Sequence, residues 1–132
     1  MSADTGAGSA LSIDVKEYAD CRVVSVSGRV DHSNSTGFMD ALQAHAGEMN
    51  AGGGMVIDLS GLEFVTSAGL RALLVAHRTV SGAGGQMIVT GLTGVVKEVF
   101  RISKFDSLLN VADGLGEAVG QISTAAADAF PG

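Results

Sequence analysis

Hydrophobic and polar residues alternate from residue 11 onward. Leu11, Ile13 and Val15 are separated by polar residues, and a second strand-like run covers residues 21–27. Alternation with a period of two is typical of a half-buried β-strand. Because only a short turn at residues 19–20 separates the two runs, the pattern predicts a β-hairpin at this point.

The rest of the chain switches between two other patterns. Short apolar runs at residues 55–59, 86–90 and 108–111 are typical of buried parallel strands. Runs with a helical spacing of apolar residues lie before, between and after them, each beginning with residues that favour a helix start. The pattern predicts helices that start near Ser33, Ser67, Thr93 and Asp113.

The predicted order of elements is therefore ββαβαβαβα. Strands that alternate with helices indicate an α/β fold with a mainly parallel central sheet, right-handed crossovers and helices packed on the sheet. The N-terminal strand is expected at an edge of that sheet. A chain of 132 residues is long enough for one domain. We expect a disordered N-terminal arm at residues 1–10, a domain at 11–127 and a tail at 128–132.

Composition narrows the range of partners. Hydrophobic residues make up 46% of the chain, and the net charge is -6. The eight basic residues are scattered, so binding to nucleic acid is not expected, because phosphate contacts need clustered Lys and Arg. The acidic balance suits a basic protein partner.

Further sequence features bear on location and on metal chemistry. Residues 1–10 lack the basic and apolar regions of a secretory signal, and no apolar run is long enough to span a membrane. The cytoplasm is therefore the expected location, with no membrane partner. Cys21 is the only cysteine, and the histidines have no metal-binding spacing, so neither a metal site nor a cofactor is expected.

The stretch MVIDLSGLEFVTSAGLRALL, residues 55–74, resembles the signature of the STAS family. That signature is an apolar strand ending in Asp, a turn with Ser or Gly, and aromatic-x-x-Ser-x-Gly-Leu at the start of a helix. Residues 28–31 look like the family's Gly-x-x-Asp turn, and residues 96–103 look like its third-helix motif. The resemblance covers roughly residues 11–125. The matching residues of the main stretch are Asp58, Ser60, Gly61, Phe64, Ser67, Gly69 and Leu70.

The resemblance implies a function. Single-domain members such as this one look like anti-sigma factor antagonists, which bind an anti-sigma factor with serine kinase activity and so release a sigma factor. In such proteins the kinase phosphorylates the serine at the position of Ser67, and binding is lost. A metal-dependent serine phosphatase then restores the unmodified form.

Two alternatives stay open. The family often has Asp before the phosphorylated serine, whereas this chain has Thr66, so either Thr66 or Ser67 is a candidate for modification. Related STAS proteins also occur in lipid-transport complexes and stress-sensing assemblies. In the second alternative, the chain is a structural or regulatory subunit of such an assembly, without a phosphate cycle.

The chemistry of Ser67 fits a switch as well as a purely structural role. Backbone N–H groups at a helix start are unpaired and the helix dipole is positive there, so the fold tolerates a phosphate. A partner packed on that phosphate meets repulsion and a desolvation cost. Ser67, Arg71, Val75 and Arg78 lie along one stripe of the helix, which we expect to be a docking face. Alternatively, Ser67 or Thr66 is only a helix cap and the helix is simply buried.

Two acidic residues and a histidine complete the candidate site. Asp58 ends a predicted strand, and Asp31 follows another. The carboxyl ends of parallel strands meet at one edge of a sheet. We therefore expect both acids to flank Ser67, with His32 nearby as a candidate partner contact. The alternative is that these carboxylates only cap loops.

An enzymatic role for Ser67 is not expected. Residues 65–69, Val-Thr-Ser-Ala-Gly, lack the first glycine of a Gly-x-Ser-x-Gly nucleophile elbow. A small hydrolase is therefore the weakest of the function classes, and we expect a binding module without catalytic residues.

Overall fold

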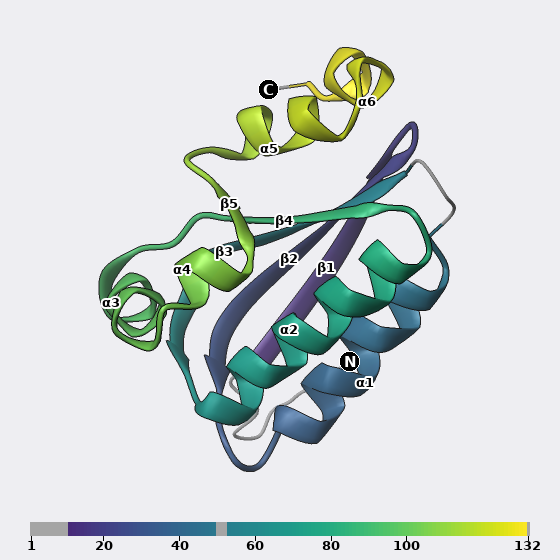
Figure 1. Cartoon of the computed structure of the whole chain (residues 1–132). Coiled ribbons are helices and arrows are strands. Elements are labelled where there is room, and N and C mark those ends of the chain that lie inside the picture. Colours follow the sequence, from purple (N-terminus) through teal and green to yellow (C-terminus); the bar gives the residue numbers. More distant parts are fainter. Residues whose placement is uncertain (1–10, 50–52, 132) are drawn as a thin grey trace.

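The computed structural model describes residues 11–49 and 53–131 (Figure 1). The N-terminal arm expected at residues 1–10 lies outside these ranges. No helix within them combines the length and the apolar character needed to cross a membrane. The elements in chain order are β1 (Leu11–Tyr18), β2 (Cys21–Val30), α1 (Ser35–Gly47), β3 (Gly54–Val65), α2 (Ser67–Gly82), β4 (Gln86–Thr90), α3 (Gly94–Ser103), α4 (Phe105–Leu108), β5 (Asn110–Ala112), α5 (Leu115–Ile122) and α6 (Thr124–Ala129).

The strands form one five-stranded mixed sheet in the order β1-β2-β3-β4-β5. β1 pairs antiparallel with β2, and the remaining neighbours are parallel. The hairpin turn between β1 and β2 is tight, and Ala19 takes a left-handed φ of 57° there. The predicted α/β fold with a mainly parallel sheet and an N-terminal edge strand is confirmed.

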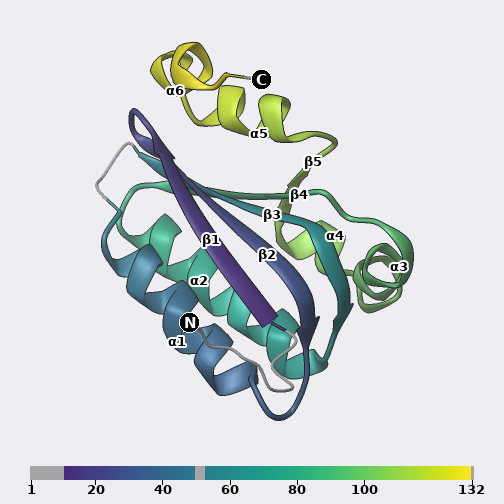
Figure 2. The same cartoon turned by 180° about the vertical axis from the view of Figure 1, so that it is seen from behind.

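Helices cover the two faces of the sheet unequally. α1 and α2 lie side by side on one face, in front of the sheet in Figure 1 and behind it in Figure 2. The main core fills the space between them and the sheet, with Phe38, Leu42, Ile57, Leu73 and Phe100 fully buried. On the other face α5 and α6 cover only the hairpin end of the sheet, over a smaller apolar cluster.

The C-terminal region differs from the single helix that the pattern predicts. Ser123 has an extended backbone, with φ -169° and ψ 160°, and separates α5 from α6. Its hydroxyl accepts a hydrogen bond from the Ala126 N–H at 3.0 Å and donates one to the Asp20 carboxylate. Because a serine in this position caps the next helix, the chain can turn and bring Phe130 against Tyr18.

A short extra helix also shifts the last strand. Lys104 takes a left-handed φ of 65° and ends α3, and one further helical turn, α4, follows. The last strand therefore starts at Asn110, whereas the pattern predicts it from Leu108, which belongs to α4.

Candidate functional site

The start of α2 is fixed to the carboxyl ends of two neighbouring strands. Val30 ends β2 and pairs with Val65, which ends β3. The Thr66 N–H continues this ladder by donating to the Val30 carbonyl at 3.1 Å. Ser67 and Asp31, the residues just beyond, therefore lie at the same end of the sheet.

Gly69 allows α2 to approach these strand ends closely. A Cβ atom at this position lies 2.5 Å from Val65 Cγ2 and 2.9 Å from Val30 Cγ1. Both distances are shorter than side chains tolerate without movement. The glycine of the motif is therefore a packing requirement, which holds the first turn of α2 against β2 and β3.

The two neighbouring hydroxyl groups at the start of α2 have different environments. Thr66 is half-buried and is the N-cap residue, and its hydroxyl accepts a hydrogen bond from the Gly69 N–H at 3.4 Å. Ser67 is the first helical residue and is exposed. Within residues 11–49 and 53–131, no hydrogen bond to the Ser67 hydroxyl is found. Of the two residues, Thr66 is therefore the helix cap, and Ser67 faces solvent.

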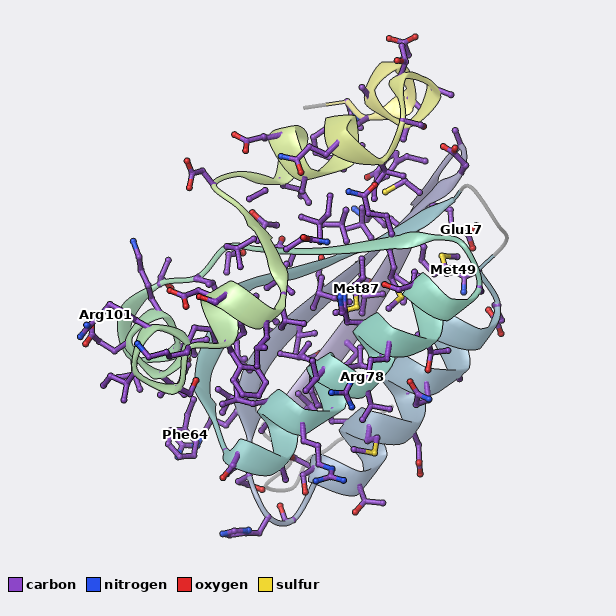
Figure 3. All side chains as sticks on the ribbon, in the orientation of Figure 1. Glu17, Met49, Phe64, Arg78, Met87 and Arg101 are labelled. Carbon is purple, nitrogen blue, oxygen red and sulfur yellow. The ribbon has the colours of Figure 1, made fainter. Side chains whose placement is uncertain are left out.

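An exposed ridge runs from Ser67 along α2. Ser67, Arg71 and Arg78 are exposed and Val75 is half-buried, so the four residues share the outer side of the helix. Figure 3 shows Arg78 on the side of α2 that points away from the sheet. We call these four residues the α2 ridge.

The opposite side of α2 is buried against the sheet and α1. Ala72 and Ala76 are fully buried, like Leu73. Thr79 and Gln43 join α2 to α1 through hydrogen bonds of 3.1 and 3.2 Å. The ridge therefore lies on the exposed side of α2, beside the exposed Ala68 and the half-buried Leu74.

The loop after β2 is held by its own polar side chains. The Asp31 carboxylate accepts hydrogen bonds from the Ser33 hydroxyl at 2.6 Å and from the Ser33 N–H at 2.9 Å. These bonds, that of the Ser33 hydroxyl above all, hold the pKa of Asp31 below its ordinary value. Asn34 accepts from the Asp31 N–H and donates to the Arg29 carbonyl. His32, at the tip of this loop, is exposed.

The prediction that Asp58 flanks Ser67 is wrong. β3 does not end at Asp58 but continues for seven more residues to Val65, which is about 20 Å along a strand. The Asp58 carboxylate instead accepts a hydrogen bond from the Ser60 N–H at 3.0 Å, in contact distance of Gly91. Asp58 therefore organises the middle of the sheet, whereas Asp31 lies at the Ser67 end.

One interaction at this end was not predicted from the sequence. Arg29 pairs in register with Phe64, and its guanidinium carbon lies 4.8 Å from the centre of the Phe64 ring. Figure 3 shows Phe64 at the border of the molecule near the end of β3. The stack forms on the sheet face opposite to α1 and α2. No local pattern reveals it, because the pairing depends on register shifts between β2 and β3.

Comparison with protein families agrees with this architecture. The model of the STAS domain matches residues 12–118, which run from the second residue of β1 into α5 and include the site at the start of α2. The chain belongs to the STAS domain family. Its α6 helix lies beyond the matched region.

Individual relatives are similar to the chain at different levels. "Putative anti-sigma factor antagonist BtrV" of Bordetella bronchiseptica is 35% identical over 71 residues, which are 54% of this chain and 61% of the relative. The chain thus matches less than two thirds of that STAS relative's length. A crystal structure of an anti-sigma factor antagonist from Mycobacterium paratuberculosis has a TM-score of 0.76 at 23% identity, covering 89% of this chain and 98% of that one.

A further STAS-fold structure is that of the Bacillus cell fate determinant SpoIIAA in the phosphorylated form. Its TM-score is 0.63 at 16% identity, and the match covers 85% of this chain and all, 100%, of that one. At these identities the solved structures establish the shared fold.

Proposed function

We propose that this STAS protein is an anti-sigma factor antagonist controlled by phosphorylation of Ser67. The unmodified protein binds an anti-sigma factor with serine kinase activity through the α2 ridge and the loop at Asp31 and His32, and a sigma factor is released. The observation that carries the proposal is the exposed Ser67 hydroxyl beside a Thr66 hydroxyl already used as a helix cap. The names of the Bordetella and Mycobacterium relatives support the antagonist function.

The local structure tolerates a phosphate on Ser67. No acidic residue lies in the first turn of α2, and the free N–H groups and dipole of a helix start favour a negative charge. Arg71, one helical turn later and also exposed, is placed to pair with that charge. A phosphate on Thr66 instead removes the cap of α2. The similar fold of SpoIIAA, described in a phosphorylated form, supports a modification that leaves the fold intact.

Phosphorylation acts on the partner's approach. A small neutral serine allows the partner to close over the ridge, whereas a phosphate brings close to two negative charges that must lose water. Pairing with Arg71 further removes this arginine from the partner. We expect binding to weaken at least a hundredfold, which corresponds to about 2.7 kcal/mol.

The decisive experiment measures binding and modification together. Incubation with the cognate kinase and ATP adds one phosphate, which mass spectrometry places on Ser67, and a metal-dependent serine phosphatase removes it. Calorimetry with the purified anti-sigma factor should show strong binding of wild type and Ser67→Ala, and weaker binding of Ser67→Asp. Thr66→Ala is the control, because it should still be phosphorylated.

The opposite result identifies the other candidate class. If Ser67→Asp and Ser67→Ala bind the anti-sigma factor equally, or if the phosphate is found on Thr66 alone, the switch at Ser67 is refuted. A chain that binds no anti-sigma factor but co-purifies with a lipid-transport or stress-sensing complex is instead a subunit of that assembly. In both cases we propose a cytoplasmic binding module with no catalysis of its own.

A further inference from the structure

The outer edge of β1 is open to another strand. β1 is the first strand of the sheet order, and within the described residues no strand pairs with its outer side. In Figure 2, β1 forms the border of the sheet, with α6 near its hairpin end. Its apolar residues Leu11, Ile13 and Val15 pack on the core but stay half-buried. Such an edge is a template for pairing with a further strand.

The hairpin determines which backbone groups point outward. Tyr18 and Cys21 close a two-residue turn, so they form a hydrogen-bonded pair. Pairs in an antiparallel ladder alternate, so residues 12, 14 and 16 bond to β2 and the residues between them point their N–H and C=O groups outward. The outward-pointing residues are Leu11, Ile13, Val15 and Glu17.

Two opposite charges lie on this strand with an unusual symmetry. Asp14 and Lys16 are exposed on the sheet face that α1 and α2 do not cover, next to Ser25 and Val23 of β2. Neither belongs to an ion pair among the described residues. Both are at equal distance from Val15 along the strand. This arrangement is complementary to itself when the strand is turned end for end.

We propose that the β1 edge binds a second copy of this chain, through antiparallel pairing of the two β1 strands centred on Val15. In this register Asp14 of each copy lies opposite Lys16 of the other. Both contacts are in non-hydrogen-bonded pairs, where Cα atoms are only about 4.5 Å apart and side chains meet most closely. Ile13 of each copy then exchanges backbone hydrogen bonds with Glu17 of the other, and the two Val15 residues with each other.

Charge selects this register over its neighbours. A pairing centred on Asp14 places the two Asp14 carboxylates opposite each other, and one centred on Lys16 does the same with two ammonium groups. Like charges directly opposite each other destabilise a strand pair. A pairing centred on Ile13 leaves both charges without partners. Only the register centred on Val15 forms two ion pairs.

The dimer leaves the α2 ridge uncovered and is independent of the proposed function. A partner strand extends the sheet beyond β1, whereas the α2 ridge lies on a helix packed on the sheet face. Ser67 therefore stays exposed in both copies. The dimer presents two switch sites, whatever binds to them.

Charge exchange on the full-length chain tests the proposal. Sedimentation equilibrium at physiological salt, where repulsion between two chains of net charge -6 is screened, should show wild type associating to a dimer. Asp14→Lys makes positions 14 and 16 both positive, and Lys16→Asp makes both negative. We expect each variant alone to associate at least tenfold more weakly.

The two single variants should restore association when they are mixed. A β1 strand that carries two positive charges then meets one that carries two negative charges, so an equimolar mixture forms a heterodimer as tight as the wild-type dimer. The double variant Asp14→Lys/Lys16→Asp should also form a homodimer. Circular dichroism of each variant checks that it is folded.

Matched controls carry the same charge changes at the opposite side of the sheet. Asp106→Lys and Lys97→Asp alter exposed residues of α4 and α3, and both should dimerise like wild type. A wild-type chain that remains monomeric up to millimolar concentration overturns the proposal. Association that is the same in wild type, both single variants and their mixture places the interface elsewhere and overturns it as well.

Discussion

Replacing Gly69 by Ala tests how closely α2 approaches the strand ends. Gly69 is the third residue of α2, and a Cβ atom there lies 2.5 Å from Val65 Cγ2 and 2.9 Å from Val30 Cγ1. Overpacking of this kind costs about 1–3 kcal/mol. Alanine gains about 1 kcal/mol over glycine inside a helix. We therefore expect a net loss of up to about 2 kcal/mol in the free energy of unfolding.

Gly37 provides a matched control. It is the third residue of α1, and a Cβ built at this position meets nothing within 4 Å beyond its chain neighbours and the backbone of its own helix. Gly37→Ala should therefore show the helix gain alone and stabilise the protein by up to about 1 kcal/mol. Thermal unfolding followed by far-UV circular dichroism should separate the two variants, since 1 kcal/mol moves the Tm of a domain of this size by about 3–6 °C.

A second substitution identifies the cause. Val65→Ala removes Cγ2, the atom nearest to the new methyl group, and should itself cost about 1–3 kcal/mol. In the Val65→Ala background, Gly69→Ala should cost at least about 1 kcal/mol less than in the wild-type protein, because only the close contact with Val30 Cγ1 at 2.9 Å remains. If Gly69→Ala stabilises the wild-type protein as much as Gly37→Ala does, the close packing of α2 on the strand ends is refuted.

Three further predictions concern single side chains. Thr66→Ala should lower the free energy of unfolding by about 1 kcal/mol, and Ser67→Ala by less than about 0.5 kcal/mol. Urea unfolding measures both losses, and equal losses would show that Thr66 is not the cap. A hydrogen bond from Arg22 holds the pKa of Glu48 below its ordinary 4.5. The stability that this hydrogen bond contributes is therefore fully present above pH 4.5, and it is lost as the pH falls through the lowered pKa of Glu48 in the folded protein. Arg22→Met should thus destabilise the protein at neutral pH, with a difference from wild type that shrinks well below pH 4.5; a difference independent of pH would contradict the pairing. Burial raises the pKa of Cys21 to about 11, so iodoacetamide should modify the native protein far more slowly than the unfolded one, and equal rates would rule out a buried thiol.

The sequence pattern predicts those parts of the fold that depend on local chemistry. The β-hairpin follows from alternation and a short turn, and β4 follows from a mainly apolar run of the predicted length. The start of α2 at Ser67 is correct because a hydroxyl residue before a helical apolar pattern is a strong start signal. The same periodicity places Arg71 and Arg78 on the exposed side.

The length of β3 could not be read from its residues. Its second half pairs only with β2, because β4 ends at Thr90, which pairs with Asp58. Ser60 and Glu63 therefore face solvent and resemble loop residues. The position of Asp58 was misjudged for this reason, since strand pairing is a property of the tertiary structure and not of the local sequence.

The packing of α2 against α1 depends on tertiary structure in the same way. Ala72 and Ala76 make a further side of α2 apolar, and both are fully buried. Their small side chains let α1 lie close to α2, where Gln43 and Thr79 meet. Which apolar side of a helix is covered depends on where its neighbours pack, and the sequence of the helix alone does not contain this information.

The contacts that hold the first turn of α2 determine how a modification of Ser67 can act. The first turn is held by the Thr66 cap, by the Thr66 N–H bond to Val30 and by close packing at Gly69. None of these contacts uses the Ser67 side chain. A phosphate on Ser67 therefore changes the charge of the surface without breaking a contact that holds the helix, and a partner must recognise the charge itself. A switch that worked by unfolding or moving α2 would need to modify a residue that makes one of those contacts. Thr66 is such a residue, and Ser67 is not.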